Sequence, residues 1–283
     1  MKKGILFTAV ILLSTVSFAQ TQEGELSGTL DATYLSAYMW RGFDQFLGAH
    51  GEGAIRPGID LDLYGTGLGL NVLWYRANTS GFENLEEIDL TLSYSSRLFE
   101  YETYATDFMV GWVYYGYPDQ PRGGSTTSTA RDRSTSDLQE AFAVLSWPEI
   151  CPEGVIPSYT AIRIWPSESG SALSRLLSDN GGAGGWIHVL GLNYDLPVEG
   201  FLPDTPEQIL HLSATVTYND GVLGVDSDWS HAVFGVSTDF DLGNDLSFVP
   251  GLYYQKSLDY WDSTSGDLFN DVLWCSMSVR YSF

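Results

Sequence analysis

The sequence predicts an all-β fold: a transmembrane, antiparallel, up-and-down β-barrel of about twelve strands with the N- and C-termini in the periplasm. Apolar and polar residues alternate along most of the chain, as in strands that have one apolar and one polar face. The composition favours strands and turns, with 17 Tyr, 14 Phe, 9 Trp and 30 Gly. The alternating segment 271–283 keeps its apolar register up to Phe283, as expected for a strand that closes a barrel in lipid.

Residues 1–19 have the features of a secretory signal peptide. Lys2 and Lys3 form a positive start, an apolar stretch follows, and Ala19 precedes the expected cleavage site. No later stretch reaches the roughly 18 consecutive apolar residues of a membrane-spanning helix. Only helices and closed barrels satisfy the backbone in lipid, so we expect residues 20–283 to form one barrel in the outer membrane of a Gram-negative bacterium. The alternative is a secreted, soluble β-sandwich, whose strands alternate in the same way.

Twelve segments alternate strongly enough to be predicted as strands. The expected strands are residues 25–40, 54–64, 68–76, 87–97, 103–115, 138–147, 159–165, 186–196, 208–219, 230–242, 246–255 and 271–283. Tight glycine-containing turns follow the second and tenth segments, whereas longer polar stretches follow most odd-numbered ones. An even strand number puts both termini on one side, with short connections in the periplasm and long ones outside the cell.

In the N-terminal half, the first five segments have clear outward faces. The residues that define these faces are Leu30 and Tyr34, Ile59 and Leu61, Leu70 and Val72, Leu90 and Leu92, and Val110 and Trp112. The first segment ends with Tyr38 and Trp40, which we expect in the aromatic girdle at the membrane interface. The second contains Pro57, which cannot donate a ladder hydrogen bond, so we expect a bulge or a local break there. The sixth segment alternates weakly, and its faces are not assigned.

In the C-terminal half, the same reasoning applies to the last four segments. Their outward faces are defined by Leu212 and Ala214, Phe234 and Val236, Leu252 and Tyr254, and Met277 and Val279. In the eighth segment Leu190 and Leu192 share one register, but the outward face is not assigned. In the seventh segment we expect Ile162 and Ile164 to face outward and Arg163 to face inward. The proline-rich connections around Pro148 and Pro197 are long for periplasmic turns, so the sixth to ninth strands depart from the general pattern.

Charged residues fall mostly on the less apolar register. A charge that faces lipid would cost roughly 2–4 kcal/mol, so we expect these residues to line the lumen. The expected lumen-lining residues are Asp31, Arg56, Asp60, Asp62, Asp89, Arg97, Asp107, Arg163, Asp239, Asp241 and Arg280. They would either line a narrow, weakly cation-preferring channel or pair with one another in a plugged lumen. The net charge of −23 argues against nucleic acid as a partner.

The sequence contains no pattern that predicts catalysis, a cofactor site or a metal site. The four histidines are isolated in the sequence: His50, His188, His211 and His231. None lies at metal-ligand spacing from another His or from a Cys. Ser213 shares the lumen register with His211, but no third residue is placed to orient this His–Ser pair as a catalytic base and nucleophile. Cys151 and Cys275 are expected to be free thiols. Because the sequence shows no catalytic, cofactor or metal-binding pattern, we predict that the protein is not an enzyme and has no cofactor.

Residues 32–45 resemble the start of a known family. They read Ala-Thr-Tyr-Leu-Ser-Ala-Tyr-Met-Trp-Arg-Gly-Phe-Asp-Gln, which is similar to the Tyr-x-Ser-x-Tyr-x-(Trp/Phe)-Arg-Gly pattern of the TorF-type porins, a bacterial outer-membrane family whose function is not established. The matching residues are Tyr34, Ser36, Tyr38, Trp40, Arg41 and Gly42. We expect a structural role for the motif: Trp40 anchors at the interface, Gly42 allows a sharp exit from the strand, and Arg41 pairs with acids of the loops.

The C-terminal pair Tyr281 and Phe283 is similar to the assembly signal of outer-membrane barrels in general. The family resemblance implies a pore. We therefore expect passive diffusion of small solutes through a porin-like channel. The alternative is a closed barrel with a structural role, or one whose loops bind a partner without transport. Expected partners are outer-membrane lipid, the barrel-assembly machinery during biogenesis, and small solutes.

Overall fold

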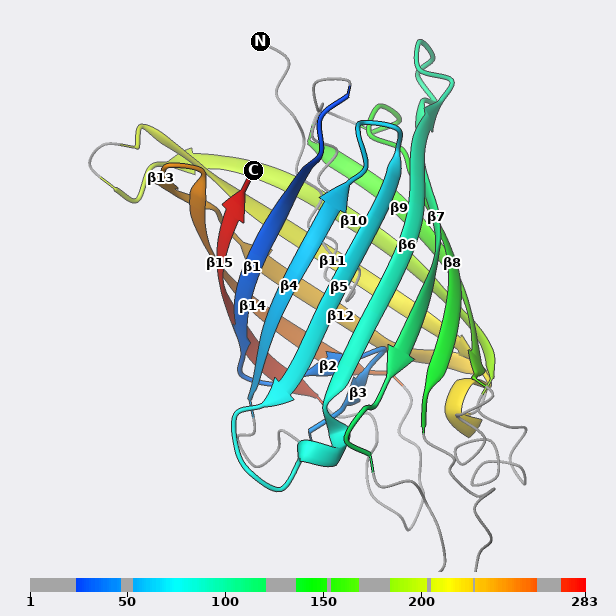
Figure 1. Ribbon diagram of the computed structural model, residues 1–283. Helices are drawn as coiled ribbons and strands as arrows, with labels where there is room; N and C mark the ends of the chain where they lie inside the picture. Colours follow the sequence, from blue (N-terminus) through cyan, green and yellow to red (C-terminus); the bar gives the residue numbers. More distant parts are fainter. Residues whose placement is uncertain are drawn as a thin grey trace, which may run out of the picture.

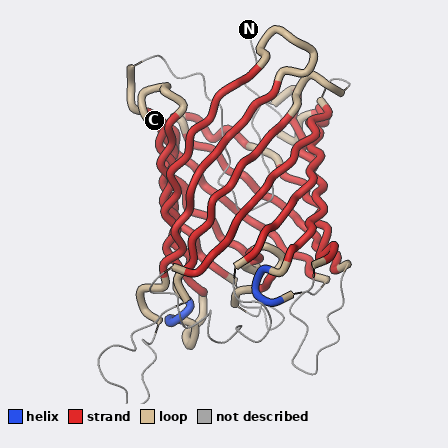
Figure 2. The backbone as a smooth tube through the Cα atoms, turned by 90° about the vertical axis from the view of Figure 1, so that its right-hand side faces the viewer, coloured by secondary structure: helices blue, strands red, loops and turns tan. Residues whose placement is uncertain are grey.

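The computed structural model describes residues 24–46, 53–120, 136–151, 154–167, 184–202, 205–225, 227–258 and 271–283. The predicted signal peptide, 1–19, lies outside these residues. The described chain forms a closed, antiparallel, twelve-stranded up-and-down barrel with tilted strands (Figures 1 and 2). The predicted fold is therefore confirmed, and each predicted strand corresponds to a strand of the barrel. No helix among the described residues is long and apolar enough to cross a membrane.

Each barrel strand pairs with its neighbours in the sequence, and the first pairs with the last. The barrel strands are β1 (Ser27–Leu35), β4 (Ala54–Asp62), β5 (Leu68–Ala77), β6 (Glu87–Leu98), β7 (Thr106–Gly116), β8 (Leu138–Ser146), β9 (Val155–Pro166), β10 (Gly185–Glu199), β11 (Glu207–Asp220), β12 (Asp228–Ser237), β14 (Leu246–Ser257) and β15 (Val272–Ser282). The seam between β1 and β15 pairs Asp31 with Arg280. Because this seam is closed, the sheet has no unpaired edge between these strands.

The predicted strand 230–242 is split in two. β12 ends at Ser237, and β13 (Phe240–Gly243) continues the pairing with β14. Side chains replace ladder hydrogen bonds at the break: the Thr238 hydroxyl donates to the carbonyl of Ile209 (2.7 Å), and the Gln208 amide donates to the carbonyl of Asp239 (2.7 Å). Alternation alone does not show such a break, because the apolar residues keep their spacing across it.

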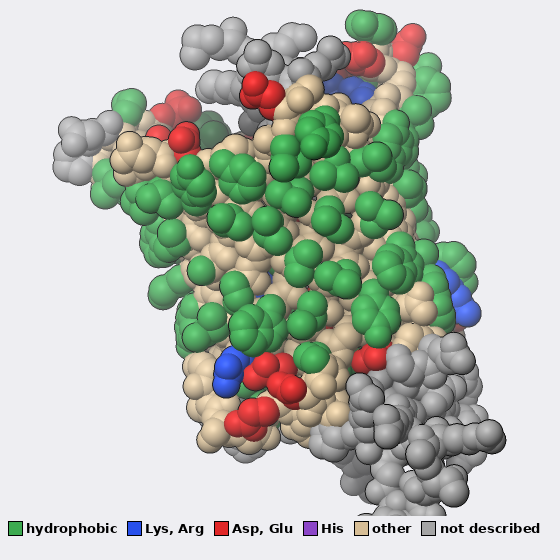
Figure 3. Space-filling model, viewed as in Figure 1, with side chains coloured by type: hydrophobic (Ala, Val, Ile, Leu, Met, Phe, Trp, Pro, Cys, Tyr) green, Lys and Arg blue, Asp and Glu red, His purple; other side chains and the backbone are tan. Residues whose placement is uncertain are grey.

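Side chains alternate between an apolar outer face and the interior. On β15, Met277 is 50% exposed and its neighbour Ser278 only 3%; on β1, Leu30 is 46% exposed and Thr33 only 4%. Figure 3 shows apolar side chains covering the outer face between the two ends of the barrel, where the acidic and basic side chains appear. This belt is the surface expected to contact lipid acyl chains.

The two ends of the barrel differ. β1 begins and β15 finishes at one end, which also carries the turns 63–67 and 244–245; we call it the turn end (Figure 1). The opposite end, the loop end, carries the connections that follow β1, β5 and β7, and the 3-10 turns η2 (Glu83–Leu85) and η4 (Val222–Gly224). The ladder between β4 and β5 has no register pairs at Arg56 and Pro57, which is the local break expected at that proline.

The expected first strand, 25–40, is too long. β1 ends at Leu35, and the chain then bends into the barrel, where β2 (Met39–Trp40) and β3 (Phe43–Asp44) form a small hairpin. Trp40 is 3% exposed inside the barrel and does not lie in an interfacial girdle. The alternation of the sequence continues from β1 into the hairpin because β2 is itself a short strand, with both of its faces buried. Periodicity could not distinguish a longer β1 from a second strand that turns inward.

The predicted faces of the seventh strand are also wrong. On β9, Ile162 and Ile164 are fully buried and point inward, whereas Arg163 lies outside, 5.8 Å from the ring centre of the exposed Trp186 on β10. The interior is apolar at this level because the wall packs against other buried apolar groups there, including the hairpin. The prediction assumed a polar interior along the whole strand, and this assumption reversed the faces.

Candidate functional site

The candidate site is the interior of the barrel, where an internal hairpin fills the loop end. We define the internal hairpin as residues 36–46, which include β2 and β3. Trp40 pairs with Phe43, so Arg41 and Gly42 form a two-residue turn with φ values of 51° and 93°. Positive φ at both central residues is the requirement of a type I′ hairpin turn, and glycine meets it without steric cost. The Arg41-Gly42 pair of the family motif therefore makes a hairpin turn inside the barrel.

Backbone and amide hydrogen bonds attach the internal hairpin to β14 and β15. The Ser36 backbone N–H donates to the carbonyl of Cys275 (2.9 Å), and the Cys275 N–H donates to the Ser36 hydroxyl (2.9 Å). At the hairpin turn, the buried amide of Gln255 donates to the carbonyl of Gly42 (2.9 Å). Both the start of the hairpin and its turn are thus held by the barrel wall.

The internal hairpin has two faces and packs against opposite parts of the wall. On one face, Tyr38 stacks on Tyr75 with ring centres 4.1 Å apart, and Trp40 meets the ring of Tyr115 edge-on at 5.7 Å. On the other face, Ala37 and Met39 join an apolar cluster of residues from β12, β14 and β15: Val233, Tyr253 and Trp274. Because its two faces contact different walls, the hairpin extends across the loop-end half of the interior.

Two buried glutamates of the wall hold the internal hairpin through polar contacts. The Arg41 guanidinium donates to Glu140 (2.6 Å), and both side chains are almost fully buried. Glu140 also accepts from the Tyr115 hydroxyl (2.9 Å). Glu87, on β6, accepts from the Tyr38 hydroxyl of the hairpin and from Tyr117 (2.6 Å). We call Arg41, Tyr38, Glu87 and Glu140 the latch, since they join the hairpin to the wall.

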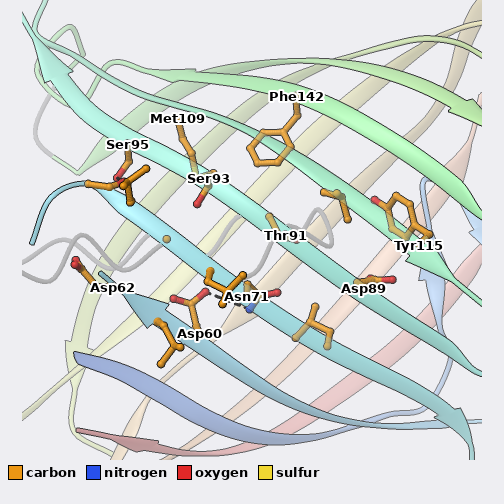
Figure 4. A pocket seen from close by; sticks show the side chains of 17 residues that line it. Asp60, Asp62, Asn71, Asp89, Thr91, Ser93, Ser95, Met109, Tyr115 and Phe142 are labelled. Atoms are coloured by element: carbon orange, nitrogen blue, oxygen red, sulfur yellow. Dashed lines mark hydrogen bonds between the residues drawn. The ribbon is translucent and has the colours of Figure 1, made fainter. Parts of the chain in front are cut away.

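A cavity of about 70 Å³ lies between the latch and the turn end, against the inner faces of β4 to β8. It extends from Asp62 and Ser95, beside the turns, to Asp89 and Tyr115, beneath the hairpin (Figure 4). Its polar residues between these ends are Asp60, Asn71, Thr91 and Ser93. Asn71 donates to the Asp60 carboxylate (3.2 Å), as the dashed line in Figure 4 marks. Its apolar side, on β7 and β8, includes Met109 and Phe142.

Charged pairs surround the interior between the cavity and the seam. Arg56 donates to Asp31 (2.8 Å) and to the Thr33 hydroxyl (3.0 Å), both on the neighbouring strand β1. These side chains are largely buried. An ion pair that is largely removed from water is costly to break, because each partner would be left buried without its counter-charge. The pair therefore fixes the position of Arg56, the only cation on β4.

A second charged group lies at the turn end, on the other side of the seam. His211 is placed between two carboxylates, with Nδ1 2.7 Å from Asp195 and Nε2 3.1 Å from Asp239. Arg280 lies 3.7 Å from Asp239. Both ring nitrogens of His211 thus face acceptors, an arrangement that suits an imidazolium donating from both. Neither nitrogen is oriented toward a hydroxyl nucleophile.

Nine of the expected lumen-lining residues lie on the inner register of the barrel. These are Asp31, Arg56, Asp60, Asp62, Asp89, Arg97, Asp107, Asp239 and Arg280. Arg97 and Asp107 pair at the turn end (2.6 Å). Arg163 lies on the outer face, as described above. Asp241 is exposed on β13, where it accepts from the Gly243 backbone N–H (2.7 Å) beyond the interior.

The family motif is divided by the bend at Ser36. Tyr34 lies on the outer face of β1, and the later motif residues belong to the internal hairpin. Arg41 pairs with a strand residue, Glu140, and not with acids of the loops, which corrects the expectation for this residue. Gly42 does allow a sharp change of direction, but inside the barrel. Tyr281 and Phe283 are exposed on the outer face, with their rings 6.3 Å apart.

Sequence reasoning missed the two wall glutamates, Glu87 and Glu140. Glu87 shares the inner register of Asp89 and begins the same strand, so its position was recoverable from alternation. Glu140 belongs to the strand whose faces could not be assigned. The aromatic partners of the hairpin, Tyr75 and Tyr115, were missed for another reason: aromatics were expected on the outer face, where barrels usually carry them.

Outside the spanning strands, one acidic residue gathers several donors at the loop end. Asp271 accepts from Lys256 (2.6 Å), from the Ser257 backbone N–H (2.9 Å) and from Tyr254 (3.2 Å). The hydrogen bond from Lys256, followed by that from the Ser257 backbone, lowers the pKa of the Asp271 carboxyl. This contact joins the start of β15 to the end of β14 and lies apart from the cavity.

The interior combines paired charges with hydroxyl groups that face the cavity. Among the described residues, no group of three or more His, Cys, Asp or Glu side chains could hold a metal ion. Cys151 and Cys275 are free thiols, as expected. Many of the polar groups inside are held in pairs and networks, and the hydroxyls of Thr91, Ser93 and Ser95 line the cavity.

Comparison with known proteins bears on the fold. No protein-family model matches the chain, and no curated protein matches it. Among solved structures, the chain is similar to a NanC porin, with a TM-score of 0.50 and 10% identity over 90% of this chain and 100% of that one. A COG4313 outer membrane channel from Pseudomonas putida F1 has a TM-score of 0.49 and 10% identity, over 96% of this chain and 100% of that one. A KdgM porin has a TM-score of 0.48 and 9% identity, over 90% of this chain and 99% of that one. At these identities the likeness concerns the barrel fold alone.

Proposed function

We propose that the protein is an outer-membrane channel of the TorF-type porin kind, which lets small solutes diffuse passively and whose internal hairpin forms the constriction. The observation that carries this proposal is the cavity, which lies inside a closed barrel and is lined by carboxylate, amide and hydroxyl groups. A barrel that serves only as a membrane scaffold would be expected to fill its interior with side chains. Here the loop-end half is filled, and part of the turn-end half is not.

The outer surface supports a location in the outer membrane. The belt of apolar side chains between two charged ends matches the lipid-facing surface of such barrels. The turn end then faces the periplasm and the loop end faces outside. Export through the signal peptide at 1–19 and recognition of Tyr281 and Phe283 by the barrel-assembly machinery belong to the same proposal. Phe283 exchanges two backbone hydrogen bonds with Gly28 across the seam (2.9 and 3.0 Å), so the proposed signal also closes the barrel.

The internal hairpin sets the size of solute that can pass. It lies across the loop-end half of the interior and is held by the latch on one side and by Gln255 on the other. A solute that enters from the loop end must pass beside the hairpin or pass when the hairpin moves. We therefore expect low conductance in the resting protein, and passage of small solutes only.

The second candidate function is a closed barrel without transport. The observation that favours it is the attachment of the hairpin to the wall at two buried glutamates, Glu87 and Glu140, which both receive hydrogen bonds. If the hairpin never moves and leaves no gap, the cavity is only the unfilled part of a structural barrel. The two functions differ in a measurable property, ion conductance.

Single-channel recording in planar lipid bilayers tests the proposal. We expect small, voltage-tolerant conductance from the wild type, and several-fold larger conductance when residues 37–45 are replaced by a Gly-Ser segment of equal length. The control is a Gly-Ser replacement of the exposed turn 243–245, which should behave as the wild type. Silence from both the wild type and the hairpin variant would overturn the channel. A silent wild type beside a conducting hairpin variant would favour the closed barrel.

A further inference from the structure

We propose that the cavity is a binding site for a small organic cation, namely a protonated amine that carries a short apolar group. This inference names the solute class of the proposed channel and rests on that function for its physiological meaning. It is carried by the chemistry of the cavity wall, by two acceptor atoms that lack donors, and by the balance of buried charge around the latch.

The wall formed by β4, β5 and β6 is acidic and rich in acceptors. Asp60, Asp62 and Asp89 line it together with the amide of Asn71 and the hydroxyls of neighbouring Ser and Thr residues. No Lys, Arg or His belongs to the lining among the described residues. Arg56, on the same strand as Asp60, is already paired with Asp31 (2.8 Å). A positively charged solute would thus find carboxylates and no competing cation within the lining.

Two oxygen atoms of this wall are buried without a donor. Asp89 and Asn71 are each 5% exposed, and the Oδ1 atom of each accepts no hydrogen bond from the described residues. The Asn71 amide nitrogen donates to Asp60 and to the carbonyl of Ile59, which leaves its oxygen free to accept. A buried acceptor without a donor is destabilising, because it has lost its hydrogen bonds to water. An ammonium group, which offers three N–H donors, is the complement of such a set.

Buried charge around the latch is unbalanced. Three carboxyl groups, those of Glu87, Asp89 and Glu140, are at most 5% exposed, and Arg41 is the cation that lies among them. Arg41 pairs with Glu140, and Glu87 receives two tyrosine hydroxyls. Asp89 is the member of the group that faces the cavity. Because Arg41 is already paired with Glu140, a cation bound in the cavity would give the Asp89 carboxyl group a partner of its own.

The apolar side of the cavity explains why the cation should be organic. Val113 lines it on β7, and Met109 on β7 and Phe142 on β8 lie beside the acidic strands β4 to β6 (Figure 4). A thioether and an aromatic ring favour contact with alkyl groups and with organic cations. The described residues offer no set of ligands for a metal ion. One water needs about 10–15 Å³ of such a cavity, so 70 Å³ suits roughly five non-hydrogen atoms, the size of n-butylammonium.

Isothermal titration of the full-length barrel in detergent micelles tests the inference. We expect saturable binding of n-butylammonium, at least tenfold weaker binding of neutral n-butanol, and no binding of butyrate. Asp89→Asn and Asp60→Asn should each weaken n-butylammonium at least tenfold. The matched control is Asp241→Asn, because Asp241 is exposed on β13 outside the cavity. Heat-modifiable gel migration shows for every variant that the barrel is folded.

Two outcomes would overturn the inference: equal affinity for n-butylammonium and n-butanol, or unchanged n-butylammonium affinity in both acidic variants. The second would mean that protonation, and not a bound cation, neutralises Asp89. Because binding is measured without conductance, failure here is distinct from failure of the channel. Binding in a barrel that never conducts would retain the site and overturn the proposed function, whereas conductance without binding would do the reverse.

Discussion

The two halves of the barrel interior are built by the same strands but bury polar groups in different ways. At the loop end, Glu87 of β6 is enclosed by tyrosine hydroxyls and the internal hairpin. Further along the same face of β6, Ser93 and Ser95 line the cavity. The loop-end half resembles the packed core of a soluble protein, with buried charges paired or hydrogen-bonded. The turn-end half is a polar cavity with acceptors still to be satisfied.

The hairpin accounts for this difference. Where it lies, the wall is apolar or carries a charge with a dedicated partner, as at Ile162, Ile164 and Glu140. Where it is absent, on the β4 to β6 side of the turn-end half, carboxylates and hydroxyls line the cavity. The inner face of a barrel strand therefore reflects what is placed against it at each level, and its polarity can change within one strand.

The largest expected effect in the loop-end half comes from Glu140→Ala. This change leaves Arg41 buried without its carboxylate, and breaking a buried pair in this way costs about 3–5 kcal/mol. We expect a loss of that order in the free energy of unfolding, measured by urea titration in lipid vesicles, together with increased conductance as the hairpin is released.

The matched control in the turn-end half is Asp107→Ala. It also removes the acid of an ion pair (2.6 Å), but its partner Arg97 has a side chain that is 38% exposed and can be solvated. We expect a loss of no more than about 1 kcal/mol. Equal losses of unfolding free energy from the two variants would show that burial does not make the Arg41–Glu140 pair more important for stability than the partly exposed Arg97–Asp107 pair. The double replacement of Arg41 by Met and Glu140 by Leu should recover most of the stability, since no charge is left unpaired.

An intermediate effect is expected from Gly42→Ala. The residue has φ of 93°, where a Cβ costs about 1–2 kcal/mol. Gly81→Ala is the control, because Gly81 has φ of 103° in a loop-end connection outside the interior, with open space where the Cβ would lie. Both variants should lose similar stability, but only Gly42→Ala should change the single-channel conductance. If Gly81→Ala changed the conductance as much, the turn of the hairpin would have no special position in the channel.

Much of the barrel follows from the sequence, because lipid imposes one rule on every outer face. The alternation of β15 assigned Met277 and Val279 to the outside and Arg280 to the inside, as the structure has them. No such rule governs the interior. The bend at Ser36 depends on hydrogen bonds to Cys275, which is 239 residues away in the sequence, and the latch joins Arg41 to Glu140 across 99 residues. Contacts of this kind leave no local pattern.

The smallest expected effect tests the face of β9, where the sequence was misleading. Arg163→Ala should cost about 0.5–1 kcal/mol, the value of a cation–π contact such as the one with Trp186. It should leave the ion selectivity of the channel unchanged, because Arg163 lies on the outer face. Arg56→Ala is the comparison: it removes an inner cation paired with Asp31 and should increase the preference for cations, measured as a reversal potential in a salt gradient. A shift from Arg163→Ala as large as that from Arg56→Ala would place Arg163 in the lumen, and the faces of Ile162 and Ile164 would then have to be exchanged.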